Sequence, residues 1–338
     1  MINDFSIIIV NFNTYPDLTK CISSILNLDI KLNYKIVVVD NNSDERNIEK
    51  INIDFPEVIL ISSMENKGFG SACNKGANVT ESKYLVFVNP DTIFFEDSFT
   101  PLFEYMEKNI NTGVCSAILE NEKKNLVYTF NNFPGLRWEI MEAFGIGSHK
   151  RILRLLKNPV ILNRSTLPMK VDWVVGAFMF FRADVFISLN GFDEDYFLYY
   201  EDVDIQKRVG LLNLKVEILP NIRICHNERS SVRNFKGENL YYFHMMRSKL
   251  IYFYKNSNII KRYLIRFLHI TGITLRFIYL PFRSKFKGKK QQKYFQYKMI
   301  FNLLFLNYYQ LLSKDLPASI YVKIPDKSNE IIKDEFWS

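Results

Sequence analysis

The first ninety residues alternate short apolar runs with amphipathic segments. Short, continuous apolar runs rich in β-branched residues are typical of strands that are buried on both faces of a parallel sheet. Four such runs occur: SIIIV at 6–10, KIVVVD at 35–40, VILIS at 58–62 and YLVFV at 84–88. We therefore predict a mostly parallel sheet in the N-terminal part of the chain.

Helical patterns lie between most of these runs. Thr14 can cap a helix that has Pro16 in its first turn and an apolar stripe at helical spacing. The segment from Asn66 to Val79 predicts a glycine-containing turn that leads into a second helix, and Asp97 or Ser98 would cap a third. This order of elements predicts an α/β fold with an open, Rossmann-like sheet flanked by helices.

Polar residues directly follow each predicted strand. In open parallel sheets, ligands bind outside the carboxyl ends of the strands. The four strand ends carry Asn11 with Asn13, Asp40-Asn41-Asn42-Ser43, Asn66-Lys67-Gly68, and Asn89-Pro90-Asp91-Thr92. Four consecutive strands therefore direct polar groups to one candidate ligand site.

Each strand end, taken alone, has more than one interpretation. The residues from Asp40 to Ser43 can form an Asx-rich turn that satisfies its own backbone. Cys73 stands where a dinucleotide fingerprint would have its third glycine, so binding of a nicotinamide cofactor is a weak interpretation. Asp91 can belong to a type I turn, or it can hold Mg²⁺ or Mn²⁺ together with substrate phosphates.

A second polar cluster concentrates six carboxylates between Asp193 and Asp204. So many like charges repel one another unless a cation, a substrate or arginines compensate them. The structural interpretation is that Glu201 and Asp202 favour the N-terminus of a helix that runs to Val209, with Asp204 paired to Arg208 one turn on.

Five motifs in this order resemble the family 2 glycosyltransferases, which have the GT-A nucleotide-sugar fold, and particularly their bacterial rhamnosyltransferase-like branch. The motifs cover about residues 5–230 and read SIIIVNFNT, VVDNNSDE, ENKGFGSACNKG, VNPDT and GAFMFFRADVFISLNGFDEDYFLYYEDVDIQKRV. The resemblance implies an inverting transfer of a sugar from a nucleotide-diphosphate donor to a hydroxyl, without a covalent enzyme intermediate.

The resemblance also implies a role for individual residues. Asp40 would bond the pyrimidine base of the donor, and the loop from Asn66 to Asn74 would line the nucleotide. Asp91 would hold a divalent cation, Mg²⁺ or Mn²⁺, on the diphosphate, with Asn89 in place of the first acid of the family's metal motif. The predicted nucleotide-sugar site comprises Asn11, Asn13, Asp40, Asn42, Asn66, Lys67, Gly68, Asn74, Asn89, Asp91, Trp173 and Gly176.

By the same resemblance, the catalytic pair is Asp202, as general base, and Glu201. A base is needed because the attacking hydroxyl must lose its proton. His226 would complete the metal site with Asp91, although a lone histidine after a strand is more often a packed or capping residue. Trp173 and Gly176 would lie beside the sugar and the acceptor, or would be a core aromatic and a close-packing glycine.

The basic charge of the chain is concentrated near its C-terminus. Residues 223–300 hold 18 basic and 2 acidic residues, a balance of +16 against a net charge of +8 for the whole chain. Aromatic and aliphatic residues are interleaved with these cations at helical spacing, which fits an amphipathic helix on an anionic membrane better than a nucleic-acid-binding surface. An ordinary helical subdomain with a solvated basic face is an equal alternative.

These patterns predict a catalytic domain at 1–235 and a basic, amphipathic helical region at 236–338. The four cysteines are far apart, which indicates neither a zinc site nor a disulfide framework and suggests a reducing compartment. No basic leader and no stretch of about 18 uncharged apolar residues is found. We expect a cytoplasmic protein, bound peripherally to the inner face of the plasma membrane through residues 236–310 rather than integral.

The predicted partners are a dTDP- or UDP-sugar and a lipid-linked oligosaccharide acceptor, with no nucleic acid. We take dTDP-L-rhamnose as the first donor, with UDP-galactose or UDP-glucose as alternatives. A sugar nucleotidyltransferase would need a glycine-rich, lysine-bearing loop where this chain has Asn11-Phe12-Asn13-Thr14. A non-catalytic lipid- or RNA-binding protein would leave the acidic cluster unexplained.

Overall fold

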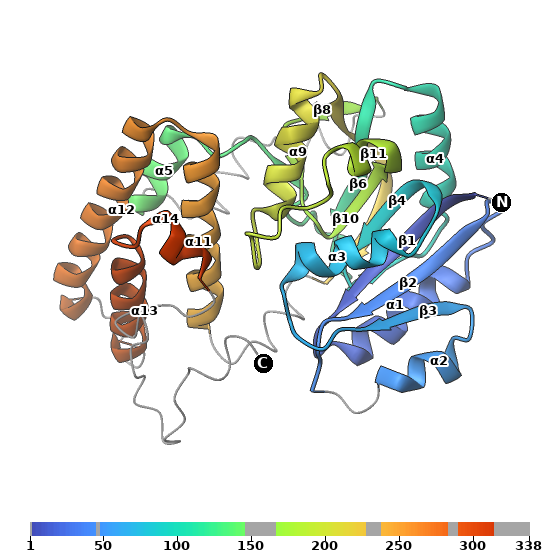
Figure 1. The fold of residues 1–338 in the computed structure, drawn as a ribbon, viewed down its shortest axis with the longest axis horizontal. Helices are drawn as coiled ribbons and strands as arrows, with labels where there is room; N and C mark the ends of the chain where they lie inside the picture. The colour runs from blue at the N-terminus through green and yellow to red at the C-terminus, as the bar shows by residue number, and fades with distance from the viewer. Residues whose placement is uncertain (1, 45–47, 146–166, 228–237, 283–289, 314–338) are drawn as a thin grey trace. The chain divides into compact units, whose positions relative to one another are not determined.

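The computed structural model describes residues 2–44, 48–145, 167–227, 238–282 and 290–313 (Figure 1). The chain divides into two units, which we describe separately. The first unit comprises Met1–Phe133, Asn158–Phe197 and Glu201–Asn234, and the second comprises Pro134–Lys157, Leu198–Tyr200 and Phe235–Ser338.

The first unit is built on a mixed sheet that has nine strands in the described residues. The strand order is β3 (Val58–Ser62), β2 (Tyr34–Asp40), β1 (Asn3–Asn11), β4 (Ser82–Val88), β10 (Phe178–Arg182), β6 (Thr112–Glu120), β11 (Lys215–His226) and β5 (Thr92–Ile93), with β8 (Met169–Val171) also paired to β11. A small second sheet joins β7 (Phe130–Asn131) to β9 (Trp173–Val174).

The first four strands are parallel, and β10 runs antiparallel between β4 and β6. The aliphatic residues of β1, β2 and β4 are buried, as expected for strands covered on both faces, whereas Ile59, Leu60 and Ile61 of the edge strand β3 are only partly buried. All four predicted strands are confirmed. The register places Asn11 opposite Asp40, so the polar ends of β1 and β2 coincide.

Helices cover both faces of this sheet, which gives the three-layer arrangement predicted for a GT-A-like fold. One core cluster joins the sheet to α1 (Tyr15–Leu26), α2 (Ile51–Asp54, after the 3₁₀ turn Ile48–Lys50) and α4 (Phe99–Lys108). The opposite cluster joins it to α3 (Phe69–Asn78), α8 (Ala183–Ser188) and α9 (Glu201–Leu211).

Of the two predicted helix caps, one is confirmed. Thr14 precedes α1, but its hydroxyl makes no capping bond and instead donates to Asn11 Oδ1. Ser98 is the N-cap residue of α4, and the carboxylate of Asp97 accepts the backbone N–H groups of Phe99 and Thr100. Asp97, one of the two residues predicted to cap this helix, therefore satisfies its start.

The second unit is helical in its described residues. Its helices are α5 (Leu136–Ala143), α11 (Glu238–Asn256), α12 (Ile259–Tyr279), α13 (Lys290–Leu303) and α14 (Tyr308–Leu312), and a 3₁₀ turn, Leu280–Phe282, extends α12. Although it precedes β8 in the chain, α5 belongs to this helical unit, and residues 146–166 lie outside the described residues.

A buried cluster of charged side chains joins α5 to its neighbours. Lys249, on α11, places its Nζ 2.6 Å from a carboxylate oxygen of Glu142 and 3.1 Å from one of Glu139. His269, on α12, bonds Glu139 Oε2 at 2.7 Å. Gly272 makes the close approach possible, because a Cβ there would lie 2.0 Å from the carbonyl oxygen of Ala143.

The sequence has no run of about 18 uncharged apolar residues, but α12 meets a broader criterion for a helix that could span a membrane. Residues Ile259–Phe282 meet that criterion by length and composition, and they are the one such helix in the described part of the chain. This criterion allows up to two charged residues in the apolar stretch, whereas the uncharged run sought in the sequence allows none.

Candidate active site

The carboxylate of Asp40, at the end of β2, is fixed by hydrogen bonds. Asn11 Nδ2 donates to its Oδ1 at 2.8 Å, and Ser43 donates through both its hydroxyl and its backbone N–H. The oxygen of the Asn11 amide accepts from Thr14, so this amide serves the protein rather than a ligand. Asn13 is bonded similarly, with its Oδ1 accepting from Asp44 N–H. Asn11 and Asn13 therefore position Asp40 and its turn.

The adjacent residue, Asn41, has a buried side-chain amide whose position the sequence did not predict. Its Nδ2 donates to Asn66 Oδ1 at 2.7 Å and to the carbonyl of Gly68 at 3.2 Å. Its Oδ1 is buried and has no partner. The predicted ligand Asn42 instead occupies the turn with a φ of 63°, so Asn41 is the asparagine that is buried toward the loop of Asn66.

The loop before α3 depends on Gly68. Its φ is +94°, and an added Cβ would lie 2.1 Å from the carbonyl oxygen of Phe197. Lys67 is exposed and paired with Glu65, whose carboxylate raises the pKa of the Lys67 ammonium. The loop thus presents backbone close to the segment that leads into α9.

Asn74 differs from its predicted role in binding the nucleotide. Its Nδ2 donates to the carbonyl of Phe192 and to Glu194 Oε1, and its Oδ1 accepts from Phe192 N–H. Both amide hydrogens are therefore used to hold the loop of Gly191–Glu194 against α3. Ser71 adds a bond to the same glutamate at 3.0 Å.

Asp91 and His226 meet at the junction of β5 and β11. The antiparallel pair places His226 opposite Thr92, and His226 Nε2 lies 3.2 Å from Asp91 Oδ1. Both side chains are buried, and His226 Nδ1 has no hydrogen-bond partner. Asn89 is only half-buried, and its backbone N–H donates to the carbonyl of Ala177.

A carboxylate and an imidazole at this spacing are oxygen and nitrogen ligands of the kind that hold Mg²⁺ or Mn²⁺. In the part of the chain that the structure describes, no group of three or more histidine, cysteine, aspartate or glutamate side chains forms a complete metal site. The structure thus brings the predicted pair together, without a third side chain of this kind among the described residues.

The carboxylates of Glu201 and Asp202 lie at the N-terminus of α9. Two tyrosines directly before them, Tyr199 and Tyr200, have φ values of 67° and 69°. Consecutive left-handed residues with bulky side chains are costly and are typical of functional sites. The predicted pairing of Asp204 with Arg208 is confirmed, with Oδ2 and Nε 2.8 Å apart.

Asp202 is held in place by backbone. The N–H of Gly176 donates to its Oδ2 at 2.9 Å. Burial raises the pKa of Asp202 to about 6, and the bonds from Gly176 and Val203 partly oppose this rise. Asp202 is therefore ionised at neutral pH but remains basic enough to accept a proton.

Glu201 is more deeply buried than its neighbour, and its Oε2 has no partner. Burial, with a further contribution from the charge of Asp202, raises the pKa of Glu201 well above its usual range. Burial therefore shifts both carboxyl groups of the pair toward their neutral forms.

Trp173 and Gly176 support the site rather than form its wall. Trp173 is 8% exposed, and its indole N–H donates to the carbonyl of Asn132. An added Cβ at Gly176 would make only ordinary contacts, 3.6 Å from Asp202, so its N–H is the functional group that the structure identifies.

Short links join these groups into one site. Asn41 connects the end of β2 to the loop of Gly68, and an added Cβ at Gly70 would lie 3.5 Å from Glu201 Cβ. Gly176 bonds Asp202, while the next residue, Ala177, bonds Asn89. The four strand ends and the start of α9 thus converge, as predicted.

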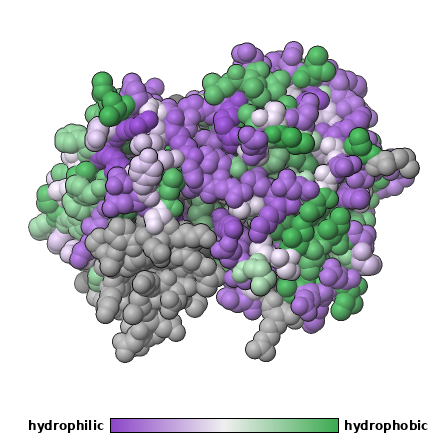
Figure 2. Space-filling model, viewed as in Figure 1, coloured by the Kyte–Doolittle hydropathy of each residue, from purple (hydrophilic) through white to green (hydrophobic). Residues whose placement is uncertain are grey.

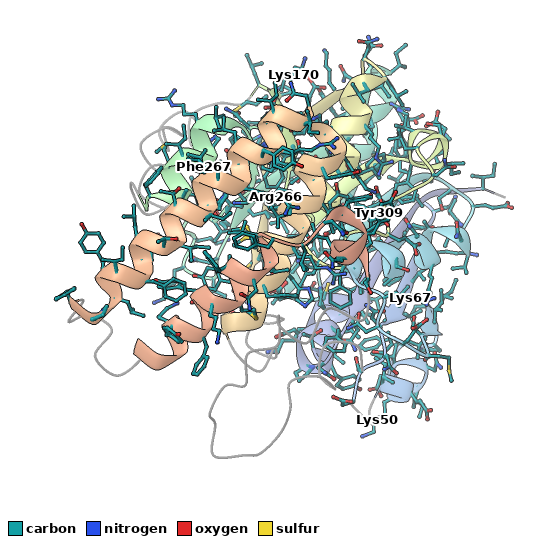
Figure 3. All side chains as sticks on the ribbon, turned by 60° about the vertical axis from the view of Figure 1, so that its left-hand side comes forward. Lys50, Lys67, Lys170, Arg266, Phe267 and Tyr309 are labelled. Atoms are coloured by element: carbon teal, nitrogen blue, oxygen red, sulfur yellow. The ribbon has the colours of Figure 1, made fainter. Side chains whose placement is uncertain are left out.

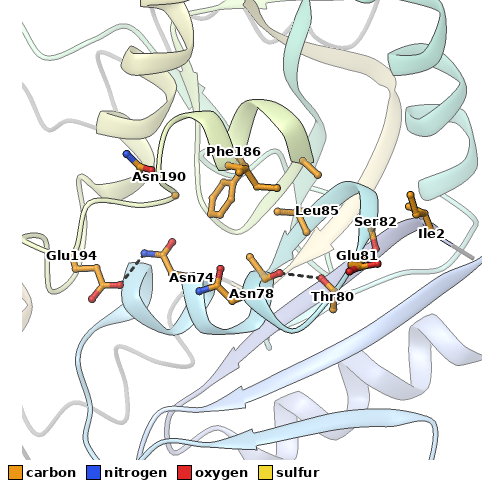
Figure 4. Close-up of a pocket in the computed structure, with 14 residues that line it drawn as sticks. Ile2, Asn74, Asn78, Thr80, Glu81, Ser82, Leu85, Phe186, Asn190 and Glu194 are labelled. Atoms are coloured by element: carbon orange, nitrogen blue, oxygen red, sulfur yellow. Dashed lines mark hydrogen bonds between the residues drawn. The ribbon is translucent and has the colours of Figure 1, made fainter.

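A pocket of about 700 Å³ lies elsewhere, beside α3 and α8 (Figure 4). Its lining includes Asn74, Phe186 and Glu194 but neither Asp91 nor Asp202. Its location separates it from the carboxylates that could perform chemistry.

Comparison with known proteins agrees with this geometry. The family model of glycosyl transferase family 2 matches residues 6–188, more than half of the chain. The chain belongs to glycosyl transferase family 2. The predicted rhamnosyltransferase-like branch is also supported by relatives, and family membership favours glycosyl transfer over nucleotidyl transfer or a non-catalytic binding role.

Two relatives show the extent of the similarity. Rhamnosyltransferase WbbL of Escherichia coli (strain K12) is 28% identical over 236 residues, which cover 68% of this chain and 85% of the relative. The N-acetylglucosaminyl-diphospho-decaprenol L-rhamnosyltransferase of Mycobacterium tuberculosis is 22% identical over 237 residues, covering 67% and 76%.

Solved structures share the fold of this glycosyltransferase. GalNAc-T7 with UDP, GalNAc and Mn²⁺ aligns with a TM-score of 0.55 at 14% identity, over 75% of this chain and 48% of that one. The mannosyltransferase PcManGT from Pyrobaculum calidifontis, with GDP-Man and Mn²⁺, aligns with a TM-score of 0.53 at 13% identity, over 90% and 84%. The predicted GT-A-like fold is confirmed.

Proposed function

We propose that this glycosyltransferase moves a sugar, with inversion, from a nucleoside-diphosphate donor to a hydroxyl of a lipid-linked glycan. The observation that carries the proposal is Asp202, a partly buried residue whose carboxyl group has a pKa of about 6 and accepts the Gly176 N–H beside the converging strand ends. L-rhamnose from dTDP-L-rhamnose is our first donor, because the relatives named above are rhamnosyltransferases. UDP-galactose and UDP-glucose are the alternatives.

Different residues of the site would bind the donor and accept the proton. Asp40, with the buried oxygen of Asn41 beside it, would receive the nucleobase, and the Gly68 loop would lie along the nucleotide. Asp202 would take the proton of the acceptor hydroxyl as that oxygen attacks the anomeric carbon. Departure of the nucleoside diphosphate on the opposite face inverts the configuration and requires no covalent enzyme intermediate.

Asp91 and His226 would hold a divalent cation, Mg²⁺ or Mn²⁺. Two protein ligands suffice when donor phosphate oxygens and water complete the coordination. The cation supplies positive charge that stabilises the departing diphosphate. Two solved structures of the same fold contain Mn²⁺, which supports a divalent cation without identifying it.

We further propose that the enzyme works at the cytoplasmic face of the plasma membrane. The four cysteines are free and buried, which is compatible with a reducing compartment. One relative's name specifies a decaprenol-linked acceptor, and an enzyme with such an acceptor would work near a membrane, which residues 236–310 of this chain would contact.

Transfer assays with dTDP-L-rhamnose, UDP-galactose and UDP-glucose on a polyprenyl-diphosphate-linked saccharide test the proposal. Asp202→Asn should lower kcat by about 100-fold or more while dTDP or UDP binding in a thermal-shift assay is unchanged. Asp91→Ala should weaken nucleotide binding in Mn²⁺ but not in EDTA. Retained turnover by Asp202→Asn would eliminate the proposed base, and metal-independent binding by the wild type would eliminate the metal role.

A further inference from the structure

One side of α12 is apolar and exposed along its whole length. Figure 2 shows hydrophobic residues gathered over this helix, which lies at the left in the view of Figure 1. The exposed positions are separated by one, three, four or eight residues, which places them on a single helix face. They are Ile260, Tyr263, Leu264, Phe267, Leu275, Ile278 and Phe282, with exposed fractions of 37% to 82%. We call these seven residues the α12 stripe.

The threonine hydroxyls within this surface are satisfied. Thr271 donates its hydroxyl to the carbonyl of Phe267, and Thr274 donates to the carbonyl of Ile270, both at 2.9 Å. Neither of these hydroxyls therefore requires water, so both threonines can enter an apolar phase together with the stripe.

The arginines of α12 are turned into the second unit. Arg266 donates to the carbonyl of Leu304, and Arg276 donates to that of Glu142. Arg262 donates to the carbonyl of Ser257. Figure 3 shows Arg266 and Phe267 on different sides of the helix. The surface that α12 presents outward is therefore apolar, whereas its cations bind protein.

The opposite side of α12 excludes a membrane-spanning position. Ile265, His269, Gly272 and Ile273 are buried within the second unit, and His269 bonds a glutamate there. Only 28% of the most apolar stretch is buried, so the helix has one covered and one open side. A spanning helix would have to expose the polar side to hydrocarbon, whereas a helix in the membrane interface needs one apolar side.

The sequence after the stripe indicates which surface it meets. Five cations and no acid occur within residues 283–290, directly after Phe282. Tyrosine at the edge of the stripe suits the boundary between headgroups and acyl chains, because its ring is apolar and its hydroxyl polar. An apolar helix face that continues into a basic run matches an anionic bilayer.

We propose that the α12 stripe lies in the headgroup–acyl boundary of an anionic membrane, because the stripe is apolar and the sequence that directly follows it is basic in composition. This inference deepens the proposed function and rests on it for the reason why the enzyme meets a membrane, but the binding itself is independent of catalysis. Most of the affinity for the membrane would come from burial of the apolar α12 stripe rather than from the basic residues of α12.

Flotation of the full-length protein with vesicles of phosphatidylcholine and phosphatidylglycerol in equal parts tests this assignment. The test variant is Phe267→Glu with Ile278→Glu. The matched control is Met64→Glu with Ile110→Glu, because these side chains are 95% and 74% exposed in the first unit. We expect the partition coefficient of the test variant to fall by about 100-fold, with the control unchanged. Melting temperature and dTDP or UDP binding of each variant are measured in parallel, to establish that the variants are folded.

Measurements of salt dependence and of self-association complete the experiment. In about 1 M NaCl, where the Debye length is about 3 Å, wild-type binding should weaken but persist. Complete release by salt, or equal binding by the test variant and the control, would overturn the proposal. So would a wild-type dimer in light scattering that the test variant loses, because the stripe would then serve a second copy of the chain. Failure of every protein to bind a nucleotide would contradict the proposed donor site but leave the vesicle result interpretable.

Discussion

Asp202→Asn should stabilise the first unit while abolishing transfer. The pKa of Asp202 rises from 3.8 to about 6 because burial disfavours the charged carboxylate. A group with a raised carboxyl pKa destabilises the folded state as pH increases, because the folded state then binds more protons than the unfolded state. The cost is absent below pH 3.8 and complete above about pH 6, where it reaches about 3 kcal/mol.

Asparagine removes this cost and retains an oxygen that can accept the Gly176 N–H. We therefore expect the free energy of unfolding of the variant to exceed that of the wild type by about 3 kcal/mol at pH 8 and by about half as much at pH 5. Asp204→Asn is the matched control on the same helix. It loses the bond to Arg208 and should destabilise the unit by about 1–3 kcal/mol.

Urea unfolding followed by the fluorescence of one tryptophan measures the first unit. The chain has three tryptophans, and Trp173 alone lies among the described residues of that unit. A background with Trp138→Phe and Trp337→Phe therefore confines the signal to Trp173. If the difference between variant and wild type does not grow from pH 5 to pH 8, burial does not raise the pKa of Asp202, and its assignment as base loses its physical support.

Three further predictions concern catalysis and packing. In the wild type, kcat should rise with pH through about 6, the pKa of Asp202, and a flat profile from pH 5 to pH 8 would exclude this base. Gly68→Ala should cost at least about 2 kcal/mol in urea unfolding, because of its φ of +94° and the short contact of the new Cβ, whereas Gly210→Ala, with nothing within 4 Å, should be neutral or stabilising. Lys249→Met should cost the second unit about 3–5 kcal/mol, because it strips a buried cation from its carboxylates, and the exposed Lys255→Met should change stability by less than about 0.5 kcal/mol. Equal melting temperatures for the two lysine variants would refute the role of the buried cluster.

The sequence predicted best those features that follow from residue type and spacing along the chain. Short runs of β-branched residues favour strands, and all four predicted runs form β1 to β4. The polar strand ends were equally readable, because parallel strands bring their carboxyl ends to the same edge. The pairing of Asp204 with Arg208 followed from helical spacing.

The sequence was least informative where a backbone turn decides the direction of a side chain. Asn41 and Asn42 are chemically identical, and the left-handed φ of Asn42 is what leaves Asn41 as the buried member. Asn74 was indistinguishable from a nucleotide ligand until its partners in the loop of Gly191–Glu194 were known. Tyr199 and Tyr200 have no sequence signal for left-handed backbone, because neither is glycine or asparagine.

The long strand β11 has a consequence for tolerance of insertions and deletions. Leu219 pairs with Ala117, but the next paired residue is Arg223, opposite Ile118, so three residues bulge out of the ladder. Pro220, one of them, has no N–H to donate. Pairing resumes afterwards and fixes His226 independently of the strand before the bulge. An insertion or deletion within the bulge would therefore change the bulge alone, and the imidazole of His226 would stay beside Asp91.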